Sequence, residues 1–303
     1  MHSPARILLA SLVLFLGGAC AGTGSSGASG GAGERPAEIP AAHRELWQAW
    51  TTEAPDWPAR REQFLRDQAL TRFFVENLTR ELVQAYLGGE LSRAHDGTSG
   101  RYDRARAELI VLGEHAVPTV SELMVLGDGS VALVCAELLE DIGAGAVPYV
   151  AGLLEREDAP ARRRAALLLA DLPRTPAVEA EVQESLAACL REDADWAVRA
   201  ASARALSIRG ARSLDLAPSR SALSAALADP DEAVSSAAAA GLGRLGDRKA
   251  IPALINHLER SERRADLQGV RSCLGALRQL SGASEPRYPA EWREWLKENG
   301  TGR

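Results

Sequence analysis

The glycines of this chain twice form the spacing GxGxxG, which in dinucleotide-binding proteins lets the backbone approach a pyrophosphate. The two copies are Gly22, Gly24, Gly27 and Gly241, Gly243, Gly246. Such a site needs a strand before the glycines and a helix after them, and neither copy follows a segment with the alternation of a strand. The first copy reflects a glycine-rich composition. The second indicates the end of a helix, where glycine relieves crowding.

Histidine and cysteine supply no catalytic or metal-binding arrangement in the sequence. His95 and Asp96 are neighbours and could form an acid–base dyad, but a pair in a polar loop is usually solvated. Of the four cysteines, three follow residue 20 and are far apart, with no CxxC: Cys135, Cys189 and Cys273. Each falls on an apolar helical stripe, where a free cysteine behaves as a small hydrophobic residue.

Paired aspartates at 193/195 and 229/231 resemble the start of a calcium-binding loop. The glycine and the distal glutamate that such a loop requires are missing. Helix capping explains these residues better, with Asp195 or Asp229 accepting hydrogen bonds from unpaired backbone N–H groups. We therefore predict no catalytic residue, no cofactor and no metal site.

Arginine is the residue type for which the sequence favours a binding role. Candidates stand at positions 162–164, 199, 204 and 209, where guanidinium groups could pair with carboxylates of a partner. The alternative is that they are solvated or bonded to acidic residues of the next repeat. An aromatic residue at a helix start could anchor a partner or pack on the neighbouring turn. The predicted partner-binding residues are Arg163, Arg164, Trp196 and Arg199.

The elements that would position these residues are paired helices. Apolar residues recur at i, i+3, i+4 and i+7, as at Ile251, Leu254, Ile255 and Leu258, which is the period of an amphipathic helix. Glycine ends one helix and proline starts the next in "GEHAVPTVSELM", "GAGAVPYVAGLL" and "GDRKAIPALINHL". The predicted helix pairs are 116–142, 147–172, 176–209, 217–245 and 250–280, after a half-unit at 102–112. One pair cannot bury its own apolar face, so repeats of this length predict a solenoid.

Two second-helix segments carry a family resemblance. "DADWAVRAASARAL" from Asp193 and "DPDEAVSSAAAAGLGRLGD" from Asp229 resemble HEAT repeats of the short bacterial type, also known as the HEAT-like repeats of phycobilisome lyases. That family often has arginine after the valine, which Arg199 matches and Ser235 does not. The resemblance implies an α-solenoid that acts as a scaffold or adaptor, and some members are enzymes.

Both ends of the repeat region are predicted to be helical caps, because a solenoid must cover its terminal apolar faces. Five of the six tryptophans lie outside the repeats. We expect a helix of about Arg60–Leu87 within an N-terminal cap and loop at 41–100, and a capping helix within 286–303. With the repeats at 101–285, the predicted fold class is all-α: a right-handed α-solenoid of about five HEAT-like pairs with caps at both ends.

The first twenty residues, "MHSPARILLASLVLFLGGAC", have a basic start, a short apolar run and small residues before Cys20. This layout resembles a bacterial lipoprotein signal, which implies that Cys20 is lipidated; a plain secretory signal is the alternative. Residues 21–40 are rich in glycine and serine and predict a flexible tether. We therefore expect a protein held by a lipid anchor in the bacterial cell envelope, at the outer membrane or the periplasmic face if the cell has two membranes.

The charge of the chain limits its partners. A formal net charge of −6 over 303 residues, with no long basic block, argues against a nucleic-acid surface. The expected function is a non-enzymatic scaffold or adaptor for an unknown protein partner. Two alternatives remain at this stage: an enzyme or chromophore-handling protein related to HEAT-like lyases, which would need a pocket of convergent polar side chains, and a structural spacer without a specific partner.

Overall fold

The structure is a computed structural model, and it describes residues 40–87 and 100–300. Within these ranges the chain forms helices and turns, with no strand. The predicted signal at 1–20 with Cys20, almost all of the predicted tether, and the pair His95 and Asp96 lie outside the described residues. The chain divides after Leu138 into two compact units, and each is described by itself.

The first unit contains the N-terminal helices and the start of the predicted repeats. Its helices are α2 (Ala41–Thr51), α3 (Trp57–Phe64), α4 (Gln68–Leu87), α5 (Gly100–Leu112), α6 (Val117–Leu126) and the first part of α7 (Gly129–Ile142). Helix α4 is central, because α2, α3, α5 and α6 all pack against it. Phe74 of α4 is fully buried. Four aromatic rings lie 5.0–6.0 Å from its ring centroid: Trp47, Trp50, Trp57 and Phe64. This aromatic core explains the tryptophans before the repeats.

The predicted single helix of about Arg60–Leu87 is wrong in one respect. Residues 65–67 interrupt it, so α3 and α4 are separate helices. Asp67 causes the break, because its carboxylate accepts hydrogen bonds from the backbone N–H groups of Ala69 and Leu70. The sequence contained this cap, but the apolar stripe of α4 concealed it.

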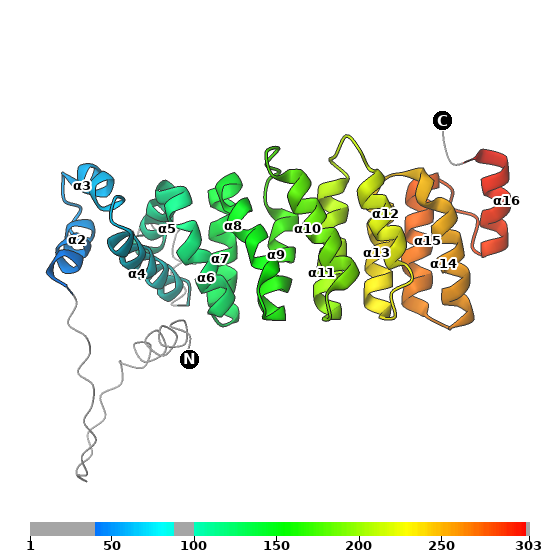
Figure 1. Ribbon diagram of the computed structural model, residues 1–303, viewed down its shortest axis with the longest axis horizontal. Helices are drawn as coiled ribbons and strands as arrows, with labels where there is room; N and C mark the ends of the chain where they lie inside the picture. The colour runs from blue at the N-terminus through cyan, green and yellow to red at the C-terminus, as the bar shows by residue number, and fades with distance from the viewer. Residues whose placement is uncertain (1–39, 88–99, 301–303) are drawn as a thin grey trace, which may run out of the picture. The chain divides into compact units, whose positions relative to one another are not determined.

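The second unit is an α-solenoid of two layers (Figure 1). One layer contains the first helices of the pairs: α8 (Val147–Gly152), α10 (Glu179–Glu192), α12 (Ala217–Ala226) and α14 (Ile251–Arg263). The other, which we call the second-helix layer, contains α9 (Ala159–Asp171), α11 (Trp196–Gly210), α13 (Glu232–Leu245) and α15 (Leu267–Ser281). Within it α9 packs on α11, α11 on α13 and α13 on α15. The predicted helix pairs of this unit are confirmed.

Every helix of the second-helix layer begins at an aspartate whose carboxylate accepts from backbone N–H groups of the first turn. The caps are Asp158, Asp195, Asp231 and Asp266. The prediction for Asp195 is confirmed, whereas Asp229 does not cap α13. Its carboxylate instead accepts from the backbone N–H of Asp231, at 2.9 Å, and from Arg199. At the other end, Gly246 and Gly282 follow α13 and α15 in the left-handed conformation that favours glycine.

The C-terminal cap is also helical. Helix α16 (Pro289–Asn299) packs against α14 and buries Trp292 completely. The ring of Trp295 contacts that of Trp292 edge to face, with centroids 5.9 Å apart. Trp292 thus covers apolar surface that the last repeat would otherwise leave in water.

Candidate protein-interaction surface

The second-helix layer of the second unit presents one face to solvent. In α13 the residues of this outward face are Ala233, Ala237, Ala240 and Arg244, which follow the i, i+4, i+7, i+11 spacing of a helical stripe and are exposed or half-exposed. The residues between them, such as Val234 and Leu242, are fully buried. The same register is exposed or half-exposed in α9 and α15, whereas in α11 one residue of the stripe, Ala201, is buried.

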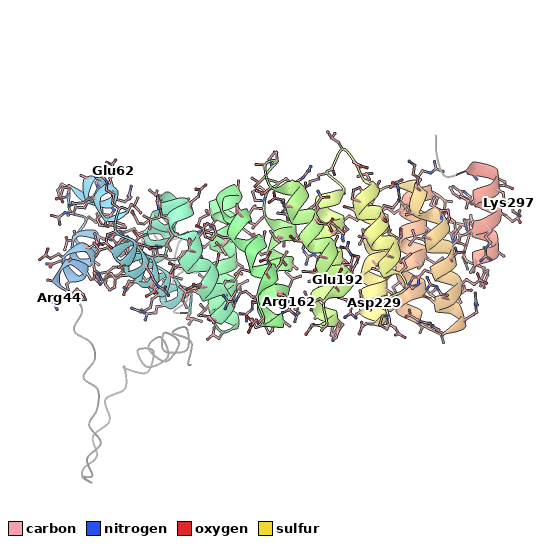
Figure 2. All side chains as sticks on the ribbon, in the orientation of Figure 1. Arg44, Glu62, Arg162, Glu192, Asp229 and Lys297 are labelled. Carbon is pink, nitrogen blue, oxygen red and sulfur yellow. The ribbon has the colours of Figure 1, made fainter. Side chains whose placement is uncertain are left out.

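The capping aspartates place equivalent residues of the four helices side by side. The residue nine positions after each cap lies on the outward face in every helix: Leu167, Arg204, Ala240 and Gly275. Figure 2 shows the start of this layer, with Arg162 and Asp229 at the same end of the helices. Equal spacing from the caps therefore sets these four residues at the same height across the face.

The part of this face over α11, α13 and α15 is a low floor surrounded by cations. The floor consists of small residues, and four exposed arginines border it. We call this surface the arginine-ringed patch; it consists of Ala237, Ala240, Gly275, Arg204, Arg244, Arg271 and Arg278. Because neighbouring packed helices lie about 8–10 Å apart, the patch is about 20 Å wide across three helices.

Charge is distributed unequally between the layers. The four helices of the second-helix layer carry nine arginines and only two carboxylates, Asp171 and Glu232, although the whole chain is acidic. Three of the nine bind acidic residues of the same unit at short range: Arg162, Arg199 and Arg209. Within the patch, Arg204 lies 3.6 Å from Asp171 with both side chains about half exposed, a contact of little energetic weight. The outward face is therefore a cationic region on an acidic protein.

Arg199 belongs to a ladder that joins consecutive repeats. Its guanidinium binds both carboxylate oxygens of Asp229, at 2.8 and 2.9 Å. Arg162 binds Asp193 in the same way, at 2.7 and 2.9 Å. Both arginines stand four residues after a cap, and both also donate to backbone carbonyls of the preceding turn. The structure therefore places Arg199 in contact with the following repeat, the alternative that the sequence had left open.

The other predicted site residues lie nearer to solvent. Arg163 is exposed on α9, while Arg164 is half-buried and has an interaction within the protein. Trp196 is the first residue of α11 and is 51% exposed. These residues are on the second-helix layer, but toward its α9 side or its N-terminal edge, away from the centre of the patch.

Three arginines of the patch were not predicted from the sequence: Arg244, Arg271 and Arg278. They lie in the last two repeats, where the position four residues after the cap, which is arginine in the two preceding repeats, is Ser235 or Val270. Their sequence distances from the capping aspartates could have placed them on the outward face: Arg244 is thirteen residues after Asp231, and Arg271 is five after Asp266. Arg244 is thus four residues after Ala240 and Arg271 four residues before Gly275, and residues four apart lie on the same face of a helix.

The first unit contains a separate cavity of about 310 Å³ lined mainly by Trp50, Trp57, Arg104 and Val111. The guanidinium of Arg104 lies over the Trp50 ring, 4.9 Å from its centroid, and donates to the Trp50 carbonyl oxygen at 2.9 Å. Arg104 also pairs with Glu53 at 3.0 Å. Its cation is thus already engaged by the protein itself.

The cysteines after residue 100 are all free thiols. Burial raises the pKa of Cys135 and of Cys273 to about 12, so both remain protonated and poorly nucleophilic at neutral pH. Cys189 is half-buried, and desolvation raises its pKa as well. Among the residues that the structure describes, no group of three or more His, Cys, Asp or Glu side chains is placed to hold a metal ion.

No single helix in the described ranges is long and apolar enough to cross a bilayer. Residues Tyr102–His115 and Val117–Leu126 reach the required length and composition only when taken together, and a bend of 110° separates them. Several of their apolar side chains, among them Leu109 and Val120, are buried inside the first unit.

Comparison with known proteins identifies the repeats. Residues 183–275 match the family described as HEAT repeats, and the matched segment includes α11, α13 and most of α15. A search of curated proteins finds no match. The crystal structure of an engineered protein is similar to 69% of this chain and 96% of its own length, with 20% identity and a TM-score of 0.43, a likeness too low to carry an argument.

Proposed function

We propose that this protein is a non-enzymatic scaffold that binds a partner protein on the outward face of its second-helix layer, and that a lipid on Cys20 anchors it in the bacterial cell envelope. The observation that carries the proposal is the arginine-ringed patch. HEAT repeats generally mediate protein–protein interaction, and this unit presents a broad, regular surface whose charge is opposite to that of the chain as a whole.

The distribution of burial supports a binding role for this face. Arg209, which faces the interior of the solenoid, is paired there with Glu179 and two backbone carbonyls. The side chains of Arg271 and Arg278, in contrast, are exposed and make no hydrogen bond or ion pair with any residue that the structure describes. Exposed cations at fixed positions on rigid helices are available to carboxylates of another protein.

The anchor is proposed from the first twenty residues. Small residues precede Cys20, and a glycine- and serine-rich segment follows it. An acylated cysteine with more than one chain gives stable membrane attachment, and an uncharged flexible segment would let the solenoid reach its partner above the lipid surface.

The scaffold is tested by photo-crosslinking in the native host. Benzoylphenylalanine replaces Ala240 on the outward face of α13 or, as a matched control, Ala225, an exposed alanine on α12 of the other layer. We expect a small set of crosslinked proteins from position 240 and none of them from position 225. Identical products from both positions, or none from position 240, would contradict the proposed face.

The anchor is tested separately by feeding cells an alkyne-tagged fatty acid. Wild-type protein should take up the label and sediment with membranes, and Cys20→Ser should do neither. Label that persists in the variant, or a wild-type protein without label, would remove the lipid anchor and leave the scaffold proposal to the crosslinking result.

A further inference from the structure

The arginine-ringed patch has a composition that selects one kind of partner. We infer that it binds an acidic segment of a partner protein, with an apolar side chain of that segment resting on Ala240 and Gly275 and its carboxylates paired with the surrounding arginines. This inference rests on the proposed scaffold function and specifies the chemistry of its ligand.

Gly275 provides evidence that is independent of charge. It lies in the middle of α15, where glycine is less favourable than alanine because it loses more backbone freedom on folding. A methyl group built at this position would meet no atom within 4 Å. Packing within the protein therefore gives no reason for a glycine here. The missing side chain keeps the floor low enough for another chain to approach the helix.

Two other glycines of this unit show what packing does require. A methyl group on Gly243 of α13 would lie 2.8 Å from the backbone of Ala276, and one on Gly241 would lie 3.1 Å from the Ser207 side chain. These glycines permit the close contact of adjacent helices. Gly275 has no such neighbour, so close packing of helices does not require a glycine at this position.

The arginines around the floor determine the charge of the ligand. Arg244 donates to the Ser207 hydroxyl oxygen at 2.9 Å, a bond that holds its guanidinium beside α11 without neutralising it. Arg271 and Arg278 stand seven residues apart on α15, so they project from the same side, above and below Gly275. A guanidinium binds a carboxylate with two parallel hydrogen bonds. Three unneutralised arginines around an apolar floor thus fit alternating acidic and apolar side chains.

A protein segment fits the patch better than a nucleic acid does. The patch is about 20 Å wide, and the whole chain, with the arginines of the patch included, has a formal net charge of −6. A long polyanion would extend beyond the patch onto surface of its own charge sign. A short acidic segment would end where the cationic surface ends.

The experiment measures binding of a fluorescein-labelled peptide of alternating glutamate and phenylalanine to the full-length protein in detergent, by anisotropy. The variant Arg244→Gln/Arg271→Gln/Arg278→Gln removes three charges of the patch. The matched control Arg191→Gln/Arg263→Gln/Arg293→Gln removes three exposed charges from the first-helix layer and α16. We expect the patch variant to bind about tenfold or more weakly, because three charge-assisted contacts are lost, and the control to change affinity by less than about twofold.

Gly275→Leu tests the floor. Leucine favours the helix and its Cβ meets open space, so the thermal midpoint should not fall, whereas peptide affinity should drop by about tenfold because the floor is blocked. Ala225→Leu on α12 is the control and should leave affinity unchanged. Unchanged binding in Gly275→Leu, with an intact thermal midpoint, would show that the ligand does not rest on the floor and would overturn the inference.

Three further results would overturn it. Equal weakening by both triple variants would show non-specific attraction. Tighter, patch-dependent binding of a short DNA duplex, or of phosphatidylglycerol vesicles, would assign the patch to another anion. If wild type does not bind the glutamate peptide above a lysine-containing peptide, the acidic ligand is excluded, and crosslinks from position 240 still decide whether the scaffold proposal holds.

Discussion

Arg209 of α11 lies in a buried two-bond pair with Glu179, the first residue of α10. Its Nη2 is 2.5 Å from one carboxylate oxygen of Glu179 and its Nε is 3.0 Å from the other. The Arg209 side chain is only 1% exposed and that of Glu179 only 6%. Nη1 of Arg209 also donates to the carbonyl oxygen of Leu169, at 2.6 Å. One guanidinium therefore joins the end of α9, the start of α10 and the end of α11.

We predict that removing one partner of this pair destabilises the second unit strongly. Arg209→Met leaves the buried Glu179 carboxylate with only Arg174, whose Nε is 3.5 Å away at a partly exposed position, and Glu179→Leu leaves a buried guanidinium uncompensated. Each should lower the free energy of unfolding by about 3–5 kcal/mol. The double variant should lose less than the sum of the two, because no unpaired charge remains. Urea unfolding of the four proteins provides the double-mutant cycle, and purely additive losses would contradict a coupled pair.

The ladder between repeats predicts acid sensitivity. Burial alone would raise the pKa of Asp193 and of Asp229, but hydrogen bonds from Arg162 and Arg199 and from backbone N–H groups outweigh it, so the pKa of each is lowered. A carboxyl whose folded-state pKa is lowered stabilises the fold above its unfolded pKa of about 4. That stability is lost as the pH falls through the folded pKa.

Urea unfolding between about pH 5 and about pH 2 tests this linkage. The free energy of unfolding should fall with pH in wild type. In Asp193→Asn/Asp229→Asn it should already be lower at neutral pH, by about 1.5–3 kcal/mol for each charge-assisted pair lost, and should fall less on acidification. Asp171→Asn, which alters an exposed pair, is the control and should keep the slope of wild type. An equally steep slope in the double variant would place the acid sensitivity elsewhere.

Much of the fold could be predicted from the sequence, because helix starts and ends are local properties. Aspartate caps, prolines in the first turn and glycines after the last turn each act within a few residues, and they fixed the pairs of the second unit. The break at Asp67 was missed because apolar residues on both sides kept a helical spacing. The cap of α13 was assigned to Asp229 instead of Asp231 because both aspartates lie within three residues of the first residue of α13 in the sequence, and the sequence alone does not distinguish them.

The site was harder to predict, because its contacts join residues about thirty positions apart. Arg199 has the same local setting whether it binds a partner or the next repeat, and only the position of Asp229 in the fold decides between them. The ladder ends after two steps because Ser235 replaces the arginine and Arg264 stands where the third aspartate would be. The exposed arginines beyond that point became visible as one surface only once the helices were placed side by side.

The burial of His257 predicts a second, smaller dependence of the free energy of unfolding on pH. Its side chain is 5% exposed, and neither ring nitrogen has a hydrogen-bond partner among the described residues. Desolvation, together with nearby Arg260 and Arg264, lowers the pKa of His257, and Asp266 opposes this only in part. Asp229 and Glu232 also line the cavity of about 10 Å³ beside the ring. Protonation therefore favours the unfolded chain.

The free energy of unfolding should accordingly decrease as the pH falls below about 6.5, the unfolded pKa of histidine, until the lower folded pKa is reached. His257→Leu removes the proton-binding group and two unsatisfied nitrogens. The variant should match wild type within about 1 kcal/mol at neutral pH and exceed it at about pH 5. Thermal or urea unfolding at both values measures the difference. A variant that loses stability in parallel with wild type over this range would exclude His257 as the cause.

Glycines on adjacent helices should respond in opposite directions to the same substitution. Gly243→Ala would force α13 away from the Ala276 backbone, only 2.8 Å from the new methyl group, and should lower the free energy of unfolding by about 1–3 kcal/mol. Gly275→Ala meets open space and should raise it by about 0.5–1 kcal/mol, because alanine is the better helix former. Urea unfolding measures both. A stability loss in Gly275→Ala would mean that packing, and not access to the outward face, requires this glycine.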